Sequence, residues 1–340
     1  MKSIKRIFAV TLGLVLFLAG VLKLMDPVGA GLVVGEYYNF FRVPFLAPTA
    51  DFAGLFLALL ETFLGVAMIC GVFPVATAVV SGVMLLVYTV LTLVMWIFNP
   101  PMECGCFGEA VHLTHAQSFL KNLVLMALWA FAFVPVQSLR KPRKVKFVSF
   151  GVAMISVVFF TIWSAMSIPP MDFTPFAPGV TLMQAEANPE QDSPLLSIST
   201  PDGDYCDELL ASGDLLLISA YDPDDLSEEA VRKIEACEAK ALAAGVTPLR
   251  LASGVFPGSG RYFNSDRRSL LTVNRSNGGA TLLRDGMVVA KWPVRSLPGT
   301  EKLLKLKEGS PAEAMVKENT PKRLKLQGFL LYVTAVLVLL

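Results

Sequence analysis

The sequence predicts an α-helical membrane bundle followed by an α/β domain outside the membrane. The 340 residues are 54% hydrophobic and 17% charged, whereas about a quarter of the residues of a typical soluble protein are charged. The apolar residues lie in runs long enough to cross a bilayer, which requires about 20 residues. After residue 168, charged residues, glycine and proline become frequent again. This change in composition predicts that the chain leaves the membrane there.

Five apolar runs predict membrane-spanning helices. The first, residues 7–25, is long for the apolar region of a signal peptide, and no small-residue cleavage site follows it cleanly. We therefore expect a first helix that is retained. A sixth run, residues 328–340, is short for a span, so it is expected to be either a truncated membrane helix or an interfacial one. The remaining four runs are residues 52–69, 75–98, 119–136 and 147–168.

Basic residues in the short loops predict how these helices are oriented. Loops rich in lysine and arginine favour the cytoplasm. One group of basic residues precedes the first helix, and another lies between the fourth and fifth helices. Because an even number of membrane crossings separates the two groups, both can lie in the cytoplasm, and they predict the same orientation. The loop with Cys104 and Cys106, and the chain after residue 168, are then expected outside, in the periplasm of a bacterium with this protein in its inner membrane. The basic residues are Lys2, Lys5, Arg6, Arg140, Lys141, Arg143, Lys144 and Lys146.

The part outside the membrane has the element order of an α/β domain. We interpret residues 169–190 as a linker and residues 191–325 as the domain. Asp225 and Glu228 have the spacing of a capping box at the start of a helix. The expected elements are strands over residues 195–199, 215–220 and 247–252, a short helix from Asp207, a helix over residues 226–244, and a hairpin of residues 280–284 and 287–292 around Asp285 and Gly286.

Strand, helix, strand and hairpin follow one another in thioredoxin-like domains, where a right-handed crossover joins the parallel strands. In thioredoxins a CxxC motif follows the first central strand. Residues 221–226, which occupy this position, contain no cysteine, and residues 277–279 stand where a cis-proline would be expected but contain none. We therefore expect a domain that binds a partner without cycling a dithiol of its own.

Cys104 and Cys106 are the candidate catalytic residues. They flank Gly105 in the loop between the third and fourth apolar runs. A disulfide between such close residues removes little loop entropy and so stabilises little, whereas glycine lets the backbone bend enough for two thiols to meet. A ring this small is strained, and strained disulfides are the more labile and oxidising ones. The pattern favours reversible redox chemistry or metal binding over a pair of incidental cysteines.

His112 and His115 follow the thiol pair and are the only histidines of the chain. Two thiolates and two imidazoles make a tetrahedral ligand set for zinc or copper. The alternative interpretation is that both histidines are ordinary polar residues at the membrane boundary.

Glu61 lies in the middle of the second apolar run, and Lys23 lies near the outer end of the first. A charged group inside a bilayer is costly and needs a partner within the bundle, for which Lys23 is one candidate. A functional interpretation is a proton path or a carboxylate close to a quinone. A structural interpretation is an ion pair, or a protonated Glu61 held in a hydrogen bond.

The other three cysteines are not expected to take part in the redox chemistry. Cys237 lies on an apolar stripe at helical spacing, which predicts a buried thiol. Cys206 has acidic neighbours that disfavour a thiolate. It is nevertheless expected on the same side of the membrane as Cys104 and Cys106, where it could exchange disulfides with them. Cys70 is at the predicted cytoplasmic end of the second helix.

Several short motifs in the first 140 residues form a pattern. They are residues 20–27 (GVLKLMDP), Glu61 with Gly65, residues 104–108 (CGCFG) and residues 119–122 (FLKN). With these motifs the region resembles the DoxX/MauE family of redox-associated membrane proteins. The resemblance implies a four-helix membrane domain over residues 1–140, to which residues 141–168 add a fifth helix and residues 326–340 a hydrophobic end. Relatives of MauE are associated with maturation of methylamine dehydrogenase, whose small subunit is rich in disulfides, so the resemblance implies a redox helper.

These features predict a periplasm-facing membrane protein that exchanges disulfides, assisting disulfide formation, maturation or electron transfer of a partner. The expected partners are the bilayer and either a periplasmic client protein or a thiol oxidoreductase. One alternative is a protein that binds zinc or copper through the two cysteines and two histidines, and another is a non-catalytic membrane scaffold. With a net charge of +1 and no basic stripe, nucleic acid is not an expected partner.

Overall fold

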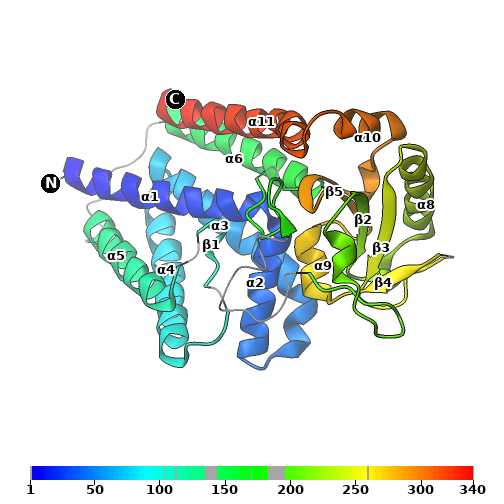
Figure 1. Cartoon of the computed structure of the whole chain (residues 1–340). Helices are drawn as coiled ribbons and strands as arrows, with labels where there is room; N and C mark the ends of the chain where they lie inside the picture. The colour runs from blue at the N-terminus through cyan, green and yellow to red at the C-terminus, as the bar shows by residue number, and fades with distance from the viewer. Residues whose placement is uncertain are drawn as a thin grey trace. The chain divides into compact units, whose positions relative to one another are not determined.

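The computed structural model describes residues 2–102, 104–111, 113–134, 144–169, 171–182, 196–258 and 260–339. The chain divides into two compact units (Figure 1). The first comprises Met1–Met166 and Gln327–Leu340, and the second comprises Ser167–Leu326.

The first unit is a bundle of apolar helices. Five helical segments in the described part of the chain are long and apolar enough to cross a membrane by length and composition, as the sequence predicts for a multi-pass membrane protein. The elements are α1 (Lys2–Met25), α2 (Pro27–Phe40), η1 (Pro44–Thr49), α3 (Ala50–Cys70), α4 (Pro74–Phe98), β1 (Cys106–Glu109), α5 (His115–Phe133) and α6 (Lys144–Ala165), with the end of α11 (Pro311–Leu339).

Helix α2 was not expected from the sequence. Its residues are interrupted by glycine and carry tyrosine and glutamate, so they make no apolar run of membrane length. The helix begins with a local signal instead. The side chain of Asp26 accepts a hydrogen bond from the Gly29 amide at 3.0 Å, and Pro27 occupies the first helical position, where its missing amide hydrogen costs nothing.

Small residues allow α1 and α3 to pack closely. A Cβ atom added to Gly20 would lie 2.2 Å from Thr62 Oγ1 and 2.8 Å from the carbonyl oxygen of Ala58. One added to Gly65 would lie 2.5 Å from the backbone nitrogen of Phe17. Backbone approach of this kind is typical of helix pairs in membranes. It fixes the position of Lys23 on α1 relative to Glu61 on α3.

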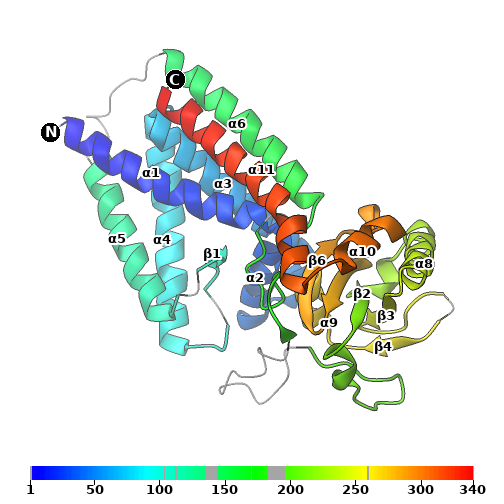
Figure 2. The ribbon, with the colours of Figure 1, turned by 45° about the horizontal axis from the view of Figure 1, so that its top comes forward.

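The sixth apolar run lies within the long helix α11 and belongs to the first unit by its contacts. The end of α11 runs beside α6 in both views (Figures 1 and 2), and Phe329 stacks on Phe160 with ring centroids 4.5 Å apart. Among the described residues, α11 is not one of the five candidate spans, although its 29 residues are long enough to cross a membrane.

The second unit is a mixed five-stranded sheet in the order β4-β3-β2-β5-β6. Strand β2 pairs in parallel with β3 and antiparallel with β5, while β4 joins β3 in parallel and β6 completes the hairpin. The strands are β2 (Asp214–Ala220), β3 (Thr247–Ala252), β4 (Tyr262–Asn264), β5 (Gly279–Arg284) and β6 (Met287–Trp292). The helices are η3 (Asp207–Leu210), η4 (Pro223–Asp225), α8 (Glu228–Ala243), α9 (Arg267–Val273), η5 (Val294–Ser296) and α10 (Thr300–Lys307). The expected α/β class is therefore confirmed.

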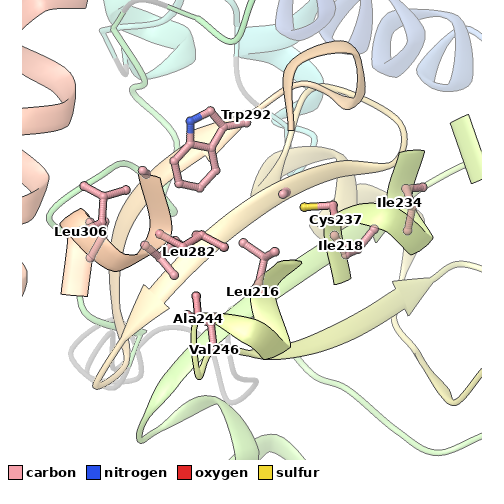
Figure 3. Packing of buried hydrophobic residues seen from close by; sticks show 14 of the residues in the cluster. Leu216, Ile218, Ile234, Cys237, Ala244, Val246, Leu282, Trp292 and Leu306 are labelled. Atoms are coloured by element: carbon pink, nitrogen blue, oxygen red, sulfur yellow. The ribbon is translucent and has the colours of Figure 1, made fainter. Parts of the chain in front are cut away.

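Alternate side chains of the central strand serve two cores. On one face Leu216 and Ile218 pack with α8 and α10 (Figure 3). On the other face Leu215 and Leu217 belong to a cluster with residues of α9. The continuous apolar run of β2 follows from burial on both faces, as expected for a strand with parallel neighbours.

Three details differ from the expectations. The capping residue of α8 is Ser227, whose hydroxyl accepts from the Ala230 amide at 3.2 Å, and not Asp225, which lies in η4 one turn earlier. Among residues 196–199 the structure has an isolated bridge at Ser199 instead of a regular strand. Phe176 and Leu182, in the expected linker, are buried in the second core because their apolar side chains cover β6 and its neighbours.

Candidate functional site

The loop between α4 and α5 brings two thiols together. The sulfur atoms of Cys104 and Cys106 lie 3.0 Å apart without a bond between them. Between them Gly105 adopts a positive φ of 62°, and a Cβ atom there would lie 2.3 Å from Val33 Cγ1. Both the backbone conformation and the space require glycine. The covalent bond of a disulfide is about 2.05 Å long, so a small movement of either side chain would close it.

Helix α2 supports this loop. The hydroxyl of Tyr37 donates a hydrogen bond to the carbonyl oxygen of Cys104 at 3.2 Å and lies 3.9 Å from its sulfur. Val33, one turn earlier on the same side of α2, packs against Gly105. The helix that sequence reasoning missed therefore positions the thiol pair. The Asp26-Pro27 start signal is the feature that would have revealed it.

The two thiols are electrostatically unequal. The Cys104 S–H stabilises a thiolate at Cys106, and Lys121 and Lys23 add positive charge nearby, so the pKa of Cys106 falls to about 5 although burial opposes this. The same pairing raises the pKa of Cys104, and burial raises it further. Tyr37 also has a raised pKa, chiefly through burial. These shifts favour a thiolate at Cys106 beside a protonated Cys104.

Lys121 approaches the loop from α5. Its Nζ atom lies 4.9 Å from the centroid of the Phe107 ring, in a cation–π contact. Residues 119–122 were singled out only through the family resemblance. The structure gives Lys121 a physical role, because its ammonium group is one of the charges that favour the Cys106 thiolate.

Glu61, Lys23 and Tyr88 form a polar cluster inside the bundle. Lys23 Nζ lies 2.6 Å and 2.8 Å from the two carboxylate oxygens of Glu61. The Tyr88 hydroxyl donates to Glu61 Oε1 at 2.6 Å. Glu61 is only 1% exposed, so the ion pair and the hydrogen bond compensate the removal of its carboxylate from water. Tyr88 was not predicted, since a tyrosine in an apolar run carries no signal of its own.

A cavity of about 310 Å³ connects this cluster to the thiol loop. Both cysteines, Lys23, Glu61 and Tyr88 line it. Most of the remaining wall is apolar, with side chains such as Val33, Val34, Leu57, Leu85 and Leu91. The structure therefore joins two features that are separate in the sequence, the thiol pair and the intramembrane carboxylate.

Asn122 contributes a buried polar group to the cavity wall. Its Nδ2 atom donates to the carbonyl oxygen of Tyr88 and to Thr92 Oγ1, both at 3.1 Å. Since a carbonyl oxygen can only accept, these bonds fix the orientation of the amide. Asn122 is 1% exposed, and within the part of the chain that the structure describes its Oδ1 atom has no hydrogen-bond partner.

The histidines do not complete a metal site among the described residues. His115 begins α5, where its Nε2 atom lies 3.1 Å from the carbonyl oxygen of Pro100. His112 lies outside the described residues. Among those that are described, no group of three or more histidine, cysteine, aspartate or glutamate side chains is placed to hold a metal ion.

The other cysteines lie apart from the pair in different settings. Cys70 is buried at the end of α3. Cys237 is 2% exposed within the core of the second unit (Figure 3), and burial raises its pKa to about 11. Cys206 is half-buried, with its sulfur 3.5 Å from the carbonyl oxygen of Asp204. All three are reduced.

Comparison with known proteins assigns the first part of the chain. Residues 1–135 match the family described as methylamine utilisation protein MauE. No curated protein and no solved structure matches the chain, and the thioredoxin-like character of the second unit stays a prediction. The match covers α1 to α5 and therefore includes the thiol loop and the polar cluster. As its motifs predicted, the amino-terminal region of this chain, residues 1–135, is similar to the MauE family.

Proposed function

We propose that this membrane protein exchanges disulfides with a partner through Cys104 and Cys106. The observation that carries the proposal is the pair of sulfur atoms 3.0 Å apart in a loop held by α2. The lowered pKa of Cys106 supports it, because the thiolate is the form that attacks a disulfide. A structural role would not need one thiol of the pair to ionise.

The exchange requires no chemistry beyond the thiols. Two thiols of a client reduce a Cys104–Cys106 disulfide in two steps, through a disulfide that links client and protein. The client gains a disulfide, and the pair returns to a thiol and a thiolate with release of one proton. The reverse sequence reduces a client disulfide. Cys106 is the sulfur we expect to react in the reduced protein, since it is both more exposed than Cys104 and ionised.

We further propose that the loop and the second unit face the periplasm. The support is the placement of Lys2, Lys5 and Arg6 at the start of α1 and of Lys144 and Lys146 at the start of α6. In that compartment disulfides form and persist. The second unit would hold the client. Its central β2–β3 pair, crossover helix α8 and β5–β6 hairpin have the thioredoxin-like order, and it has no cysteine at η4.

Trapping tests the proposal directly. In membranes, the Cys104→Ser variant keeps the reactive Cys106 and should accumulate a disulfide-linked partner, which mass spectrometry would identify. The Cys106→Ser variant should trap much less, because the remaining thiol is buried and protonated. Cys70→Ser and Cys237→Ser are controls that should behave as the unaltered protein.

Two outcomes would reject this function. One is the absence of a trapped species in both loop variants. The other is a protein without Cys104 and Cys106 that retains full activity in cells, which would instead favour a scaffold.

A further inference from the structure

The cavity next to the thiol pair has the features of a binding site for a redox-active ring. Resting on the proposed function, we infer that a membrane-soluble quinone binds there and takes the electrons of Cys104 and Cys106. The bound quinone is then the oxidant that restores the Cys104–Cys106 disulfide after each client has been oxidised.

The size and wall suit an apolar ring. A cavity of about 150 Å³ lined by apolar side chains is enough for benzene, and the volume here is about 310 Å³. The extra space accommodates ring substituents and the start of an isoprenoid chain. Leu57 and Leu91 belong to helices that cross the membrane, so a lipid-soluble molecule would find the apolar environment it prefers.

The polar groups suit both oxidation states of a quinone. A quinone has carbonyl oxygens that accept hydrogen bonds, and the Lys23 ammonium can still donate a third hydrogen after its two contacts with Glu61. A quinol has hydroxyl groups that donate. The partnerless Oδ1 atom of Asn122 is an acceptor in the same wall, and a buried acceptor without a partner costs free energy unless a ligand satisfies it. An acyl chain would satisfy neither group.

The position allows direct electron transfer. Cys104, Gly105 and Cys106 themselves line the cavity, so the ring would lie against the sulfurs. The sulfur–sulfur bond forms as the pair loses two electrons and Cys104 loses its proton. The quinone gains these two electrons and becomes a quinol by taking up two protons. One is the proton of Cys104, and the other replaces the proton that Cys106 released on ionising and comes from water.

The experiment uses the full chain, reduced and reconstituted in lipid nanodiscs without oxygen, with a decyl-chain ubiquinone analogue as the probe. We expect loss of quinone absorbance and formation of the Cys104–Cys106 disulfide in equal amounts. The Leu57→Trp variant places a bulky ring in the cavity and should slow this reaction by about tenfold or more, equivalent to roughly 1.4 kcal/mol. Leu86→Trp is the matched control, because Leu86 is 56% exposed on α4 and does not line the cavity.

A second oxidant separates this inference from the proposed function. We expect oxidised glutathione to react at Cys106, the more exposed of the two cysteines, without entering the cavity, so Leu57→Trp should react with it at an unchanged rate. If the unaltered protein reacts with glutathione but not with the quinone, the quinone inference is wrong and the thiol function stands. If neither reagent oxidises the pair, both fail. Equal slowing by Leu57→Trp and Leu86→Trp would also overturn the inference, since it would indicate a general effect on folding.

Discussion

At the scale of single residues, the unequal thiols make a prediction about pH. The pKa of Cys106 is lowered to about 5 by the Cys104 S–H and by Lys121 and Lys23. A thiolate should therefore form with a midpoint near that pH, far below the ordinary cysteine pKa of about 8.5. Ultraviolet thiolate absorbance, measured against pH as the difference between the unaltered protein and Cys106→Ser, would show it. In Lys121→Gln the midpoint should rise. A midpoint above pH 8 in the unaltered protein would contradict the assignment.

Gly105 is the residue on which the loop geometry depends. In Gly105→Ala the new Cβ atom would meet Val33, and the positive φ of 62° would become strained. We expect the thiols to separate and disulfide closure to slow, with a loss of about 1–3 kcal/mol in stability. The rate of closure with oxidised glutathione measures this. The double variant Gly105→Ala/Val33→Ala relieves the contact but not the backbone strain, so it should recover only part of the rate; full recovery would show that φ is unimportant.

At the scale of elements, the approach of α1 and α3 holds the polar cluster together. Gly20→Ala would place a Cβ atom against Thr62 and the backbone of α3, forcing the helices apart and costing roughly 1–3 kcal/mol. Gly151→Ala on α6 is the matched control, because nothing lies within 4 Å of the added atom. That change should be neutral or stabilise the helix by up to about 1 kcal/mol. Thermal unfolding in detergent would compare the two, and equal stability of both variants would contradict this account of the packing.

The helices and strands differ in how well the sequence predicts them. The spans and strands β2, β3, β5 and β6 were predictable because each is marked by a continuous local pattern of apolar residues or by a turn. Helix α2 has only a start signal, so it was missed. The cavity could not have been predicted. Lys23, Glu61, Tyr88, Asn122 and the thiol loop come from four helices and a connection, and no local pattern records that their side chains meet.

At the scale of the whole molecule, the stability of the second unit should fall in acid. Asp172 and Lys291 form a buried ion pair of 2.6 Å. Burial opposes ionisation of Asp172, but Lys291 and Thr174 outweigh it and hold its pKa below the usual value. Because the pKa of Asp172 is lower in the folded than in the unfolded protein, its ionised carboxylate stabilises the folded state at pH values above the unfolded-state pKa of about 3.9. That contribution is lost as the pH falls through the folded-state pKa.

Asp172→Asn isolates this contribution. It should destabilise the protein by roughly 1–3 kcal/mol at neutral pH and by less at an acidic pH close to the lowered folded-state pKa of Asp172, where part of its carboxylate is protonated. Urea unfolding of the full chain at both pH values, followed by tryptophan fluorescence, to which Trp292 contributes from the second unit, measures the difference. Asp202→Asn, at an exposed turn, should change stability at neither pH. An Asp172→Asn effect that is independent of pH would show that the ion pair is not the cause.

The last prediction concerns the topology of the chain across the membrane. Because loops rich in basic residues favour the cytoplasm, we expect the loop cysteines and the second unit on one side of the membrane and the start of α6 on the other. In intact cells a membrane-impermeant thiol reagent should label Cys106 and the half-buried Cys206. Labelling of Cys206 tests whether the second unit lies outside the cytoplasm. In a background without other cysteines, Lys144→Cys at the exposed start of α6 should react only after the membrane has been permeabilised. The reverse pattern would put the thiol pair in a reducing compartment, where a disulfide would not persist, and the proposed exchange with periplasmic clients would be untenable.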